Sequence, residues 1–165
     1  MLKSRTIRDG LVVGFIGYIS VAALYAVFDL VAARGTLYTV DLLGKSMFRG
    51  LRDAGVLGLP IRPDLTTVFW YNWLHLAVSL AIGLIVTGLV GLAERRPKHA
   101  PLVLFTIVAG FVVTIVVVGL LTNPIRPLLP WWSIVVANAL AVLLAGIYLL
   151  RKRPGIWARL IPFAG

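Results

Sequence analysis

Four nearly uninterrupted apolar stretches, each about 20 residues or longer, constrain this chain more than any other feature of its sequence. A hydrocarbon core about 30 Å thick is crossed by about 20 residues of α-helix. Backbone polar groups in lipid must be satisfied within their own segment, and stretches this long achieve that as helices rather than as barrel strands. The sequence therefore predicts an all-α integral membrane bundle of four transmembrane helices. The predicted spans are residues 11–33, 68–93, 102–121 and 131–150.

Composition supports a lipid environment and excludes some chemistry. The 165 residues are 60% hydrophobic, and the mean hydropathy is +0.98, whereas a soluble domain is about half apolar. Cysteine is absent, which excludes disulfides, thiolate metal sites and dithiol redox chemistry. The net charge of +10 comes from basic residues that flank the spans, where they contact lipid headgroups. We therefore expect a lipid bilayer as a partner, and no nucleic acid.

Basic residues are divided unevenly between the two sides that four spans would create. The side with both termini and the loop between the second and third spans would carry ten Lys and Arg, and the other side six. By the positive-inside rule, this asymmetry predicts a multi-pass protein of the bacterial inner (plasma) membrane with both termini in the cytoplasm. The aromatic residues that would mark the outer interface are Trp70, Tyr71, Trp73, Trp131 and Trp132.

The outer loop, residues 34–67, contains a segment with helical periodicity at 40–54. Thr39 can cap its start and Gly55 can end it. The pattern predicts a short amphipathic helix on the outer membrane surface or over the bundle, or else a docking surface or lid over an outer cavity. Its apolar side would be Val40, Leu43, Met47 and Leu51, opposite Asp41, Lys45, Arg49 and Arg52.

Small residues recur every four positions in each predicted span, which marks the faces through which helices pack in lipid. We expect these rows to hold a self-contained bundle, or in part to face other subunits. Residues 1–165 form one predicted membrane domain, with an inner-surface anchor at 151–165. The rows are Gly10, Gly14, Tyr18, Ala22 and Ala26; Ser79, Gly83, Thr87 and Gly91; Thr106, Gly110 and Thr114; and Ser133, Ala137, Ala141 and Ala145.

A polar side chain falls at a similar depth near the outer surface in every predicted span. Asp29 is the one acidic residue inside a predicted span, and intramembrane charges are costly enough to be candidate functional groups. His75 would lie about 9 Å below the outer end of its span, and Thr114 and Asn138 about 10 Å below the ends of theirs. We expect one cluster, which could be a binding site, made of Asp29, Asn72, His75, Thr114 and Asn138.

Three functions are open for this cluster. As hydrogen-bonded glue, it would fix the register of the helices. Alternatively, Asp29 and His75 would handle a proton or bind a small solute, as in a small transporter or proton-coupled carrier. In the third function, His75 would be the single protein ligand of a tetrapyrrole, either haem or (bacterio)chlorophyll. The second histidine, His99, is in the predicted inner loop, which rules out a bis-histidine haem within this chain.

The usual catalytic constellations are missing from the sequence. There is no Gly-x-Ser-x-Gly elbow, phosphate-binding Gly-rich loop, His-Glu-x-x-His pair or closely spaced carboxylate pair. We expect no catalytic residues, no metal site and no cofactor apart from the tetrapyrrole alternative. Because the loops are short and small-residue rows abound, the preferred function is a non-catalytic accessory or structural subunit, whose partners are other membrane subunits.

Overall fold

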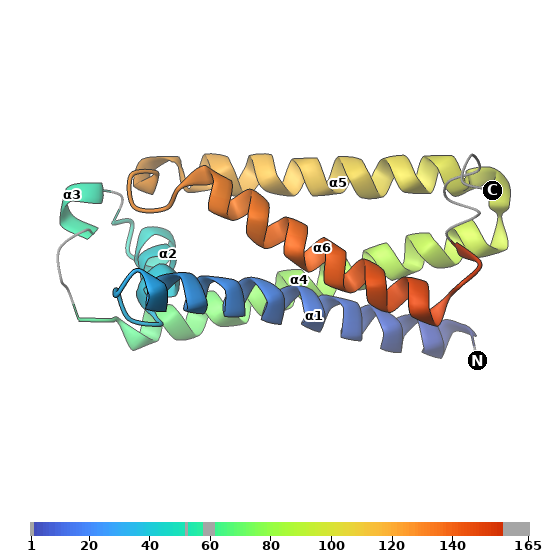
Figure 1. Ribbon diagram of the computed structural model, residues 1–165, viewed down its shortest axis with the longest axis horizontal. Coiled ribbons are helices and arrows are strands. Elements are labelled where there is room, and N and C mark those ends of the chain that lie inside the picture. Colours follow the sequence, from blue (N-terminus) through green and yellow to red (C-terminus); the bar gives the residue numbers. More distant parts are fainter. Residues whose placement is uncertain (1, 52, 58–61, 157–165) are drawn as a thin grey trace.

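The computed structural model describes residues 2–51, 53–57 and 62–156, and these residues are mostly α-helical, with no strand among them. The long helices lie along one axis, with α6 crossing obliquely from the α5 side to α1 (Figure 1). Each is long and apolar enough to cross a membrane, which confirms the predicted all-α, four-span fold. They are α1 (Leu2–Val31), α4 (Leu65–Arg95), α5 (Ala100–Leu121) and α6 (Trp131–Lys152).

Local backbone conformation and capping side chains explain where the long helices begin and end. α1 begins nine residues before the predicted start of the first span, and it ends before Ala33, which has a φ of +54° that interrupts a right-handed helix. Asp64 caps α4, because its carboxylate accepts from the backbone N–H groups of Thr66 and Thr67. Short 3-10 turns that begin with or include proline join the spans: η1 (Pro97–His99) precedes α5, and η2 (Asn123–Ile125) follows it.

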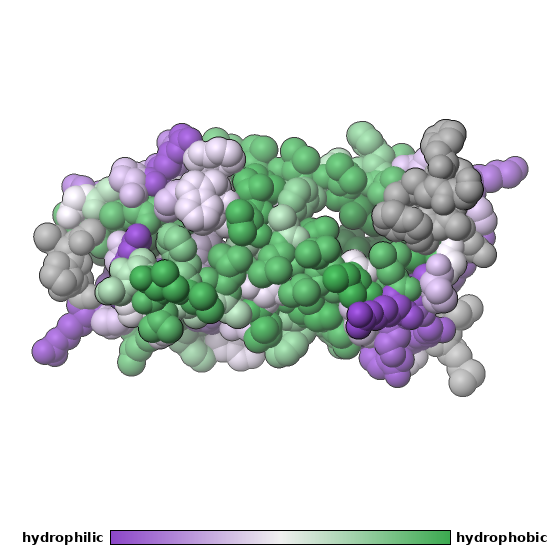
Figure 2. Space-filling view, viewed as in Figure 1, coloured by the Kyte–Doolittle hydropathy of each residue, from purple (hydrophilic) through white to green (hydrophobic). Residues whose placement is uncertain are grey.

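We name the two ends of the bundle after the parts of the chain that lie there. The terminal end holds the start of α1, η1 and the end of α6, and the loop end holds the first loop, η2 and the start of α6. Hydrophobic side chains cover the middle of the visible face and hydrophilic ones gather at both ends (Figure 2). Such an apolar band between polar ends is the surface of a protein that lies across a bilayer.

The first loop contains the expected short helix, with bounds and a buried side that differ from the prediction. The helix is α2 (Tyr38–Phe48), followed by the single turn α3 (Ala54–Leu57). Thr39 lies inside α2 rather than at its cap. Of the predicted charged side, Asp41 and Lys45 are buried and Arg49 is exposed, while Met47 and Leu51 of the predicted apolar side are exposed. Lipid can accept the exposed apolar side chains, and protein groups pair with the two buried charges.

The tightest contact in the bundle is between α1 and α4. A Cβ built on Gly14 would lie 2.6 Å from the backbone of both Ser79 and Leu80, and one on Gly83 would overlap the backbone of Gly10 and Gly14. These glycines belong to the predicted small-residue rows. Their missing side chains let the two backbones touch, as small residues do in membrane helix pairs.

α6 also packs on α1, through its own small-residue row. Ser133 and Ala137 are buried, and Tyr25 of α1 shares a hydrogen bond with Ser133 at 3.2 Å between the two hydroxyl oxygens. Apolar side chains gather into one cluster at each end. The cluster at the terminal end is Val13, Val90, Ala93, Ala100, Val103, Leu149 and Ile156, and that at the loop end is Leu42, Leu57, Ile125, Leu129 and Ile134.

α5 is the peripheral helix of the bundle. Only 6% of its most apolar window of 18 residues is buried, against 17% to 22% for the other three. It joins the apolar clusters near its two ends, through Ala100 and Val103 at the terminal end and Val118 at the loop end. Between these anchors, a Cβ on Gly110 would have no atom within 4 Å. Most of α5 is therefore left uncovered by the described part of the chain.

Part of the predicted inner-surface anchor, 157–165, lies outside the described residues, as do Arg52 of the predicted amphipathic helix and residues 58–61 of the outer loop. Within the described part, Ile156 is 3% exposed and belongs to the apolar cluster at the terminal end. The chain after α6 therefore packs on the bundle at this point.

Candidate functional site

Asp29, the predicted intramembrane acid, is 1% exposed and bonds to the first loop. Its Oδ2 accepts from the backbone N–H of Thr39, and its Oδ1 accepts from the Thr39 hydroxyl, both at 2.7 Å. The carboxylate therefore satisfies the first turn of α2, where backbone N–H groups lack partners within the helix. Asp29 ties the end of α1 to the start of α2.

Asn72 and His75 are brought together around Tyr18 of α1. The Tyr18 hydroxyl donates to Asn72 Oδ1 at 3.0 Å, and Asn72 Nδ2 donates to the Val68 carbonyl at 2.9 Å. The His75 ring lies 5.2 Å from the Tyr18 ring and 6.2 Å from the Tyr71 ring, centroid to centroid. Sequence reasoning placed Tyr18 on the correct face of α1 without giving it this role.

Thr114 and Asn138 bond to their own helices. The Thr114 hydroxyl donates to the Gly110 carbonyl, and Asn138 Nδ2 donates to the Ile134 carbonyl, both at 2.8 Å. Within the described residues, no hydrogen bond links any two of the five side chains predicted to meet. Their shared depth is not enough to join them, because rotation about each helix axis decides which face a side chain occupies. Solute binding and tetrapyrrole ligation by His75 remain predictions, and an absorption spectrum tests the latter.

A second polar network, which the sequence did not predict, joins α2 to the start of α4. Asp41 Oδ1 accepts from the Asp64 N–H at 2.8 Å, and Asp41 Oδ2 pairs with Lys45, whose ammonium also reaches the Arg62 carbonyl. Asp64 pairs in turn with Arg49 at 3.0 Å. Asp41 and Lys45 are buried, so their pairing satisfies two charges beside the bundle. The four-residue spacing from Asp41 to Lys45 was the available signal.

The ionisation of Asp64 is tuned by this network. Partial desolvation acts to raise the pKa of its carboxyl, but the Thr67 N–H and the Arg49 guanidinium outweigh that effect and hold the pKa below its usual value. The Thr66 N–H acts in the same direction. Asp64 is therefore a carboxylate at neutral pH, where it caps α4 and binds Arg49.

A third network, also unpredicted, closes the terminal end of the bundle. Asp9 of α1 is 0% exposed and pairs with Arg153, just after α6, at 3.2 Å. Arg153 also pairs with Glu94 of α4, and the Tyr148 hydroxyl donates to Asp9 at 3.4 Å. One guanidinium thus connects three transmembrane helices through two carboxylates, a geometry suited to its fork of donors. A further arginine, Arg5, lies 4.0 Å from Asp9.

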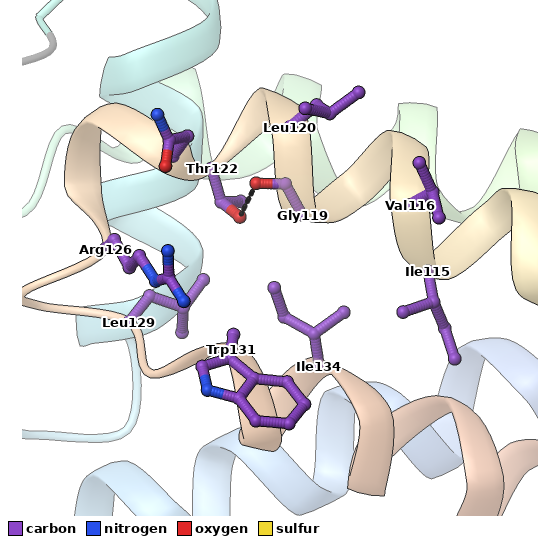
Figure 3. A pocket seen from close by; sticks show the side chains of 10 residues that line it. Ile115, Val116, Gly119, Leu120, Thr122, Arg126, Leu129, Trp131 and Ile134 are labelled. Carbon is purple, nitrogen blue, oxygen red and sulfur yellow. Dashed lines mark hydrogen bonds between the residues drawn. The ribbon is translucent and has the colours of Figure 1, made fainter.

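A groove opens between α5 and α6 at the loop end, with a volume of about 300 Å³. Ile115 of α5 points toward Ile134 and Trp131 of α6 across it, and Arg126 lies at the end near the connecting turn (Figure 3); Val116 and Gly119 also line it. None of the five side chains of the predicted polar cluster lines it. The remaining lining residues are Leu120, Thr122, Asn123 and Leu129.

The groove is apolar along its walls and polar at one end. The Thr122 hydroxyl donates back to the Val118 and Gly119 carbonyls of its own helix, so it brings no free donor into the groove (Figure 3). Arg126 is exposed and forms no ion pair within the described part of the chain. The site offers an apolar slot and a cation, which is chemistry suited to holding an amphipathic molecule.

Metal coordination has no support in the arrangement of the described side chains, since no three His, Asp or Glu residues among them gather at one point. Comparisons with known protein families, with curated proteins and with solved structures find no match to this chain.

Proposed function

We propose that this chain is a non-catalytic accessory subunit of a larger membrane assembly, and that α5 is the helix that contacts a partner. The observation that carries the proposal is the small-residue row on α5. Thr106 and Gly110 are exposed, and Thr114 is only partly buried. A Cβ on Gly110 would meet no atom within 4 Å, so no described helix packs closely against the row at this glycine.

The rows on the other helices support this interpretation by contrast. Gly14 of α1 and Gly83 of α4 are in backbone contact, and Ser133 and Ala137 of α6 are buried. In lipid, small residues mark the faces where helices approach closely. A glycine inside a helix costs about 1 kcal/mol relative to alanine, and at Gly110 no packing by the described residues offsets that cost. A transmembrane helix of a partner subunit would offset it.

The polar side chains also favour a structural protein over a carrier. Asp29 is committed to Thr39, Asn72 to Tyr18 and Val68, and Asn138 to its own helix. Groups engaged in this way hold helices in register. They do not present a set of convergent ligands to a solute, which is what a carrier site requires.

Site-specific cross-linking in native membranes tests the proposal. A photoreactive side chain at Val113 of α5, which is 59% exposed, is compared with the same group at Val27 of α1, which is 60% exposed. We expect a discrete cross-linked product of higher mass from position 113 only, lost when Gly110→Leu is added. Equal diffuse labelling from both positions, or a product of twice the mass of this chain, would contradict the proposal.

We further propose a location in the bacterial inner membrane, with the terminal end of the bundle in the cytoplasm. The start of α1 and the end of α6 lie together, since Arg5 donates to the Lys152 carbonyl at 3.1 Å. The chain lacks cysteine, so single cysteines report topology directly. An impermeant maleimide should label Thr36→Cys in intact spheroplasts and Lys98→Cys only after lysis, and the reverse pattern would invert the orientation.

A further inference from the structure

The groove between α5 and α6 has its polar and apolar parts arranged in order along the helix axis. Arg126 and Asn123 lie at its end near η2, beyond the last turn of α5. Ile115 lies seven residues before Thr122, which places it about 10 Å farther into the bundle. The groove therefore runs from the depth of lipid headgroups into the depth of acyl chains.

Arg126 is the polar group that distinguishes this groove from the rest of the apolar surface. Two other arginines at the loop end have partners: Arg49 pairs with Asp64, and Arg34 lies over the rings of Phe28 and Tyr38. Arg126 has neither an ion pair nor a ring partner among the described residues. A guanidinium at this depth binds phosphate well, because its donors match the oxygens in pairs.

We propose that this groove is a phospholipid-binding site, in which Arg126 contacts the headgroup phosphate and an acyl chain lies between α5 and α6. The apolar walls, chiefly Ile115 and Ile134, would pack along the acyl chain, and Trp131 would lie near the glycerol region, where aromatic side chains concentrate in membranes. Charge complementarity and the order of the lining groups both match such a lipid. The site is independent of the proposed partner contact.

Two glycines on α5 allow the site to be tested separately from that contact. Gly119 lines the groove, whereas Gly110 does not. Nine residues make about two and a half helical turns, so the two glycines lie on opposite sides of α5. A Cβ at either position would have no atom within 4 Å. Gly119→Leu should therefore extend an apolar side chain into the groove, and Gly110→Leu is its matched control.

The experiment measures lipid binding to the purified full-length chain by native mass spectrometry, with added phosphatidylglycerol or diacylglycerol of the same acyl chains. The wild-type protein should prefer phosphatidylglycerol by about tenfold, as expected for one exposed charge-assisted contact. Arg126→Gln should erase this preference, and Gly119→Leu should weaken binding of both lipids. Gly110→Leu and Arg62→Gln, which removes an exposed arginine outside the groove, should bind as the wild type does.

The preference between two lipids is measured within one variant, so partial unfolding cannot imitate the loss expected for Arg126→Gln. Wild-type preference retained in Arg126→Gln, or full binding in Gly119→Leu, would overturn the proposal. Equal losses of lipid binding in all four variants would overturn it as well, because they would show that the lipids bind to the protein surface in general and not in the groove. A failure to obtain the cross-link at position 113 would count against the proposed partner contact, but not against the lipid site.

Discussion

Gly83 of α4 lies against Gly14 of α1 so closely that a Cβ on Gly83 would overlap the backbone nitrogen of Gly14. Gly83→Ala should therefore force the two helices apart. We expect it to destabilise the protein by about 2 kcal/mol, within the range for overpacked sites. The measurement is unfolding of the purified protein by sodium dodecyl sulfate in mixed micelles, followed by circular dichroism.

Gly88, five residues along the same helix, is the matched control. A Cβ there would meet no atom within 4 Å, so Gly88→Ala should leave stability unchanged or raise it by up to about 1 kcal/mol through helix propensity. If the two variants unfolded alike, the close approach of α1 and α4 at Gly83 would not contribute to stability.

Asp29 should be essential for docking α2. Asp29→Ala removes both acceptors of the Thr39 N–H and hydroxyl, and it leaves a buried helix start unsatisfied. Loss of charge-assisted capping should cost about 2 kcal/mol or more. Thr39→Val keeps the backbone contact and should cost less. Both effects are read from the same unfolding midpoint.

Asp53 provides the comparison for Asp29, since its carboxylate also accepts a backbone N–H, that of Gly55, at 2.8 Å, but is exposed. Asp53→Ala should cost less than about 1 kcal/mol. An Asp29→Ala variant as stable as Asp53→Ala, but defective in solute uptake, would favour the carrier hypothesis over the structural role.

The spans could be predicted well from the sequence, because apolar runs of this length satisfy their backbone hydrogen bonds in lipid by forming helices. It also located the close glycine contacts, since small residues every four positions are the main signal for helix packing there. The buried side of α2 could not be predicted, because hydrophobic periodicity marks the same residues whether the apolar side faces protein or lipid. Asp41 and Lys45 show the outcome: both charges face inward.

The candidate site was harder to predict for a geometric reason. Depth along a helix follows from residue number, whereas the direction of a side chain depends on how each helix is rotated and paired. Asp29 and His75 share a depth, yet Asp29 bonds to Thr39 while His75 lies beside Tyr18. Asp9 and Arg153 escaped notice because both fall outside the predicted spans. The groove depends on the tilt of α6 relative to α5, which no local pattern encodes.

The network at the terminal end predicts strong coupling between Asp9 and Arg153. Arg153→Met leaves the buried Asp9 carboxylate without its closest cation, and we expect a loss of about 3 kcal/mol. The double variant Asp9→Asn, Arg153→Met should lose less than the sum of the single variants, because neither charge is then left alone. Arg151→Met, at an exposed position on the same segment, should be nearly neutral. Additive losses would argue against the ion pair.

Asp64 should make the loop end sensitive to acid. Its pKa is lower in the folded protein than in the unfolded chain, where an Asp titrates near pH 3.9, because the Thr67 N–H and Arg49 stabilise the carboxylate. Its contribution to stability is therefore fully present above that unfolded value and is lost as pH falls through the folded pKa. Asp64→Asn keeps a capping oxygen but no charge. We expect the wild type to be more stable than Asp64→Asn at pH 7, and the difference in unfolding midpoint to shrink below about pH 4. A difference that stayed constant from pH 7 to pH 3 would show that the charge of Asp64 does not hold α2 and α4 together.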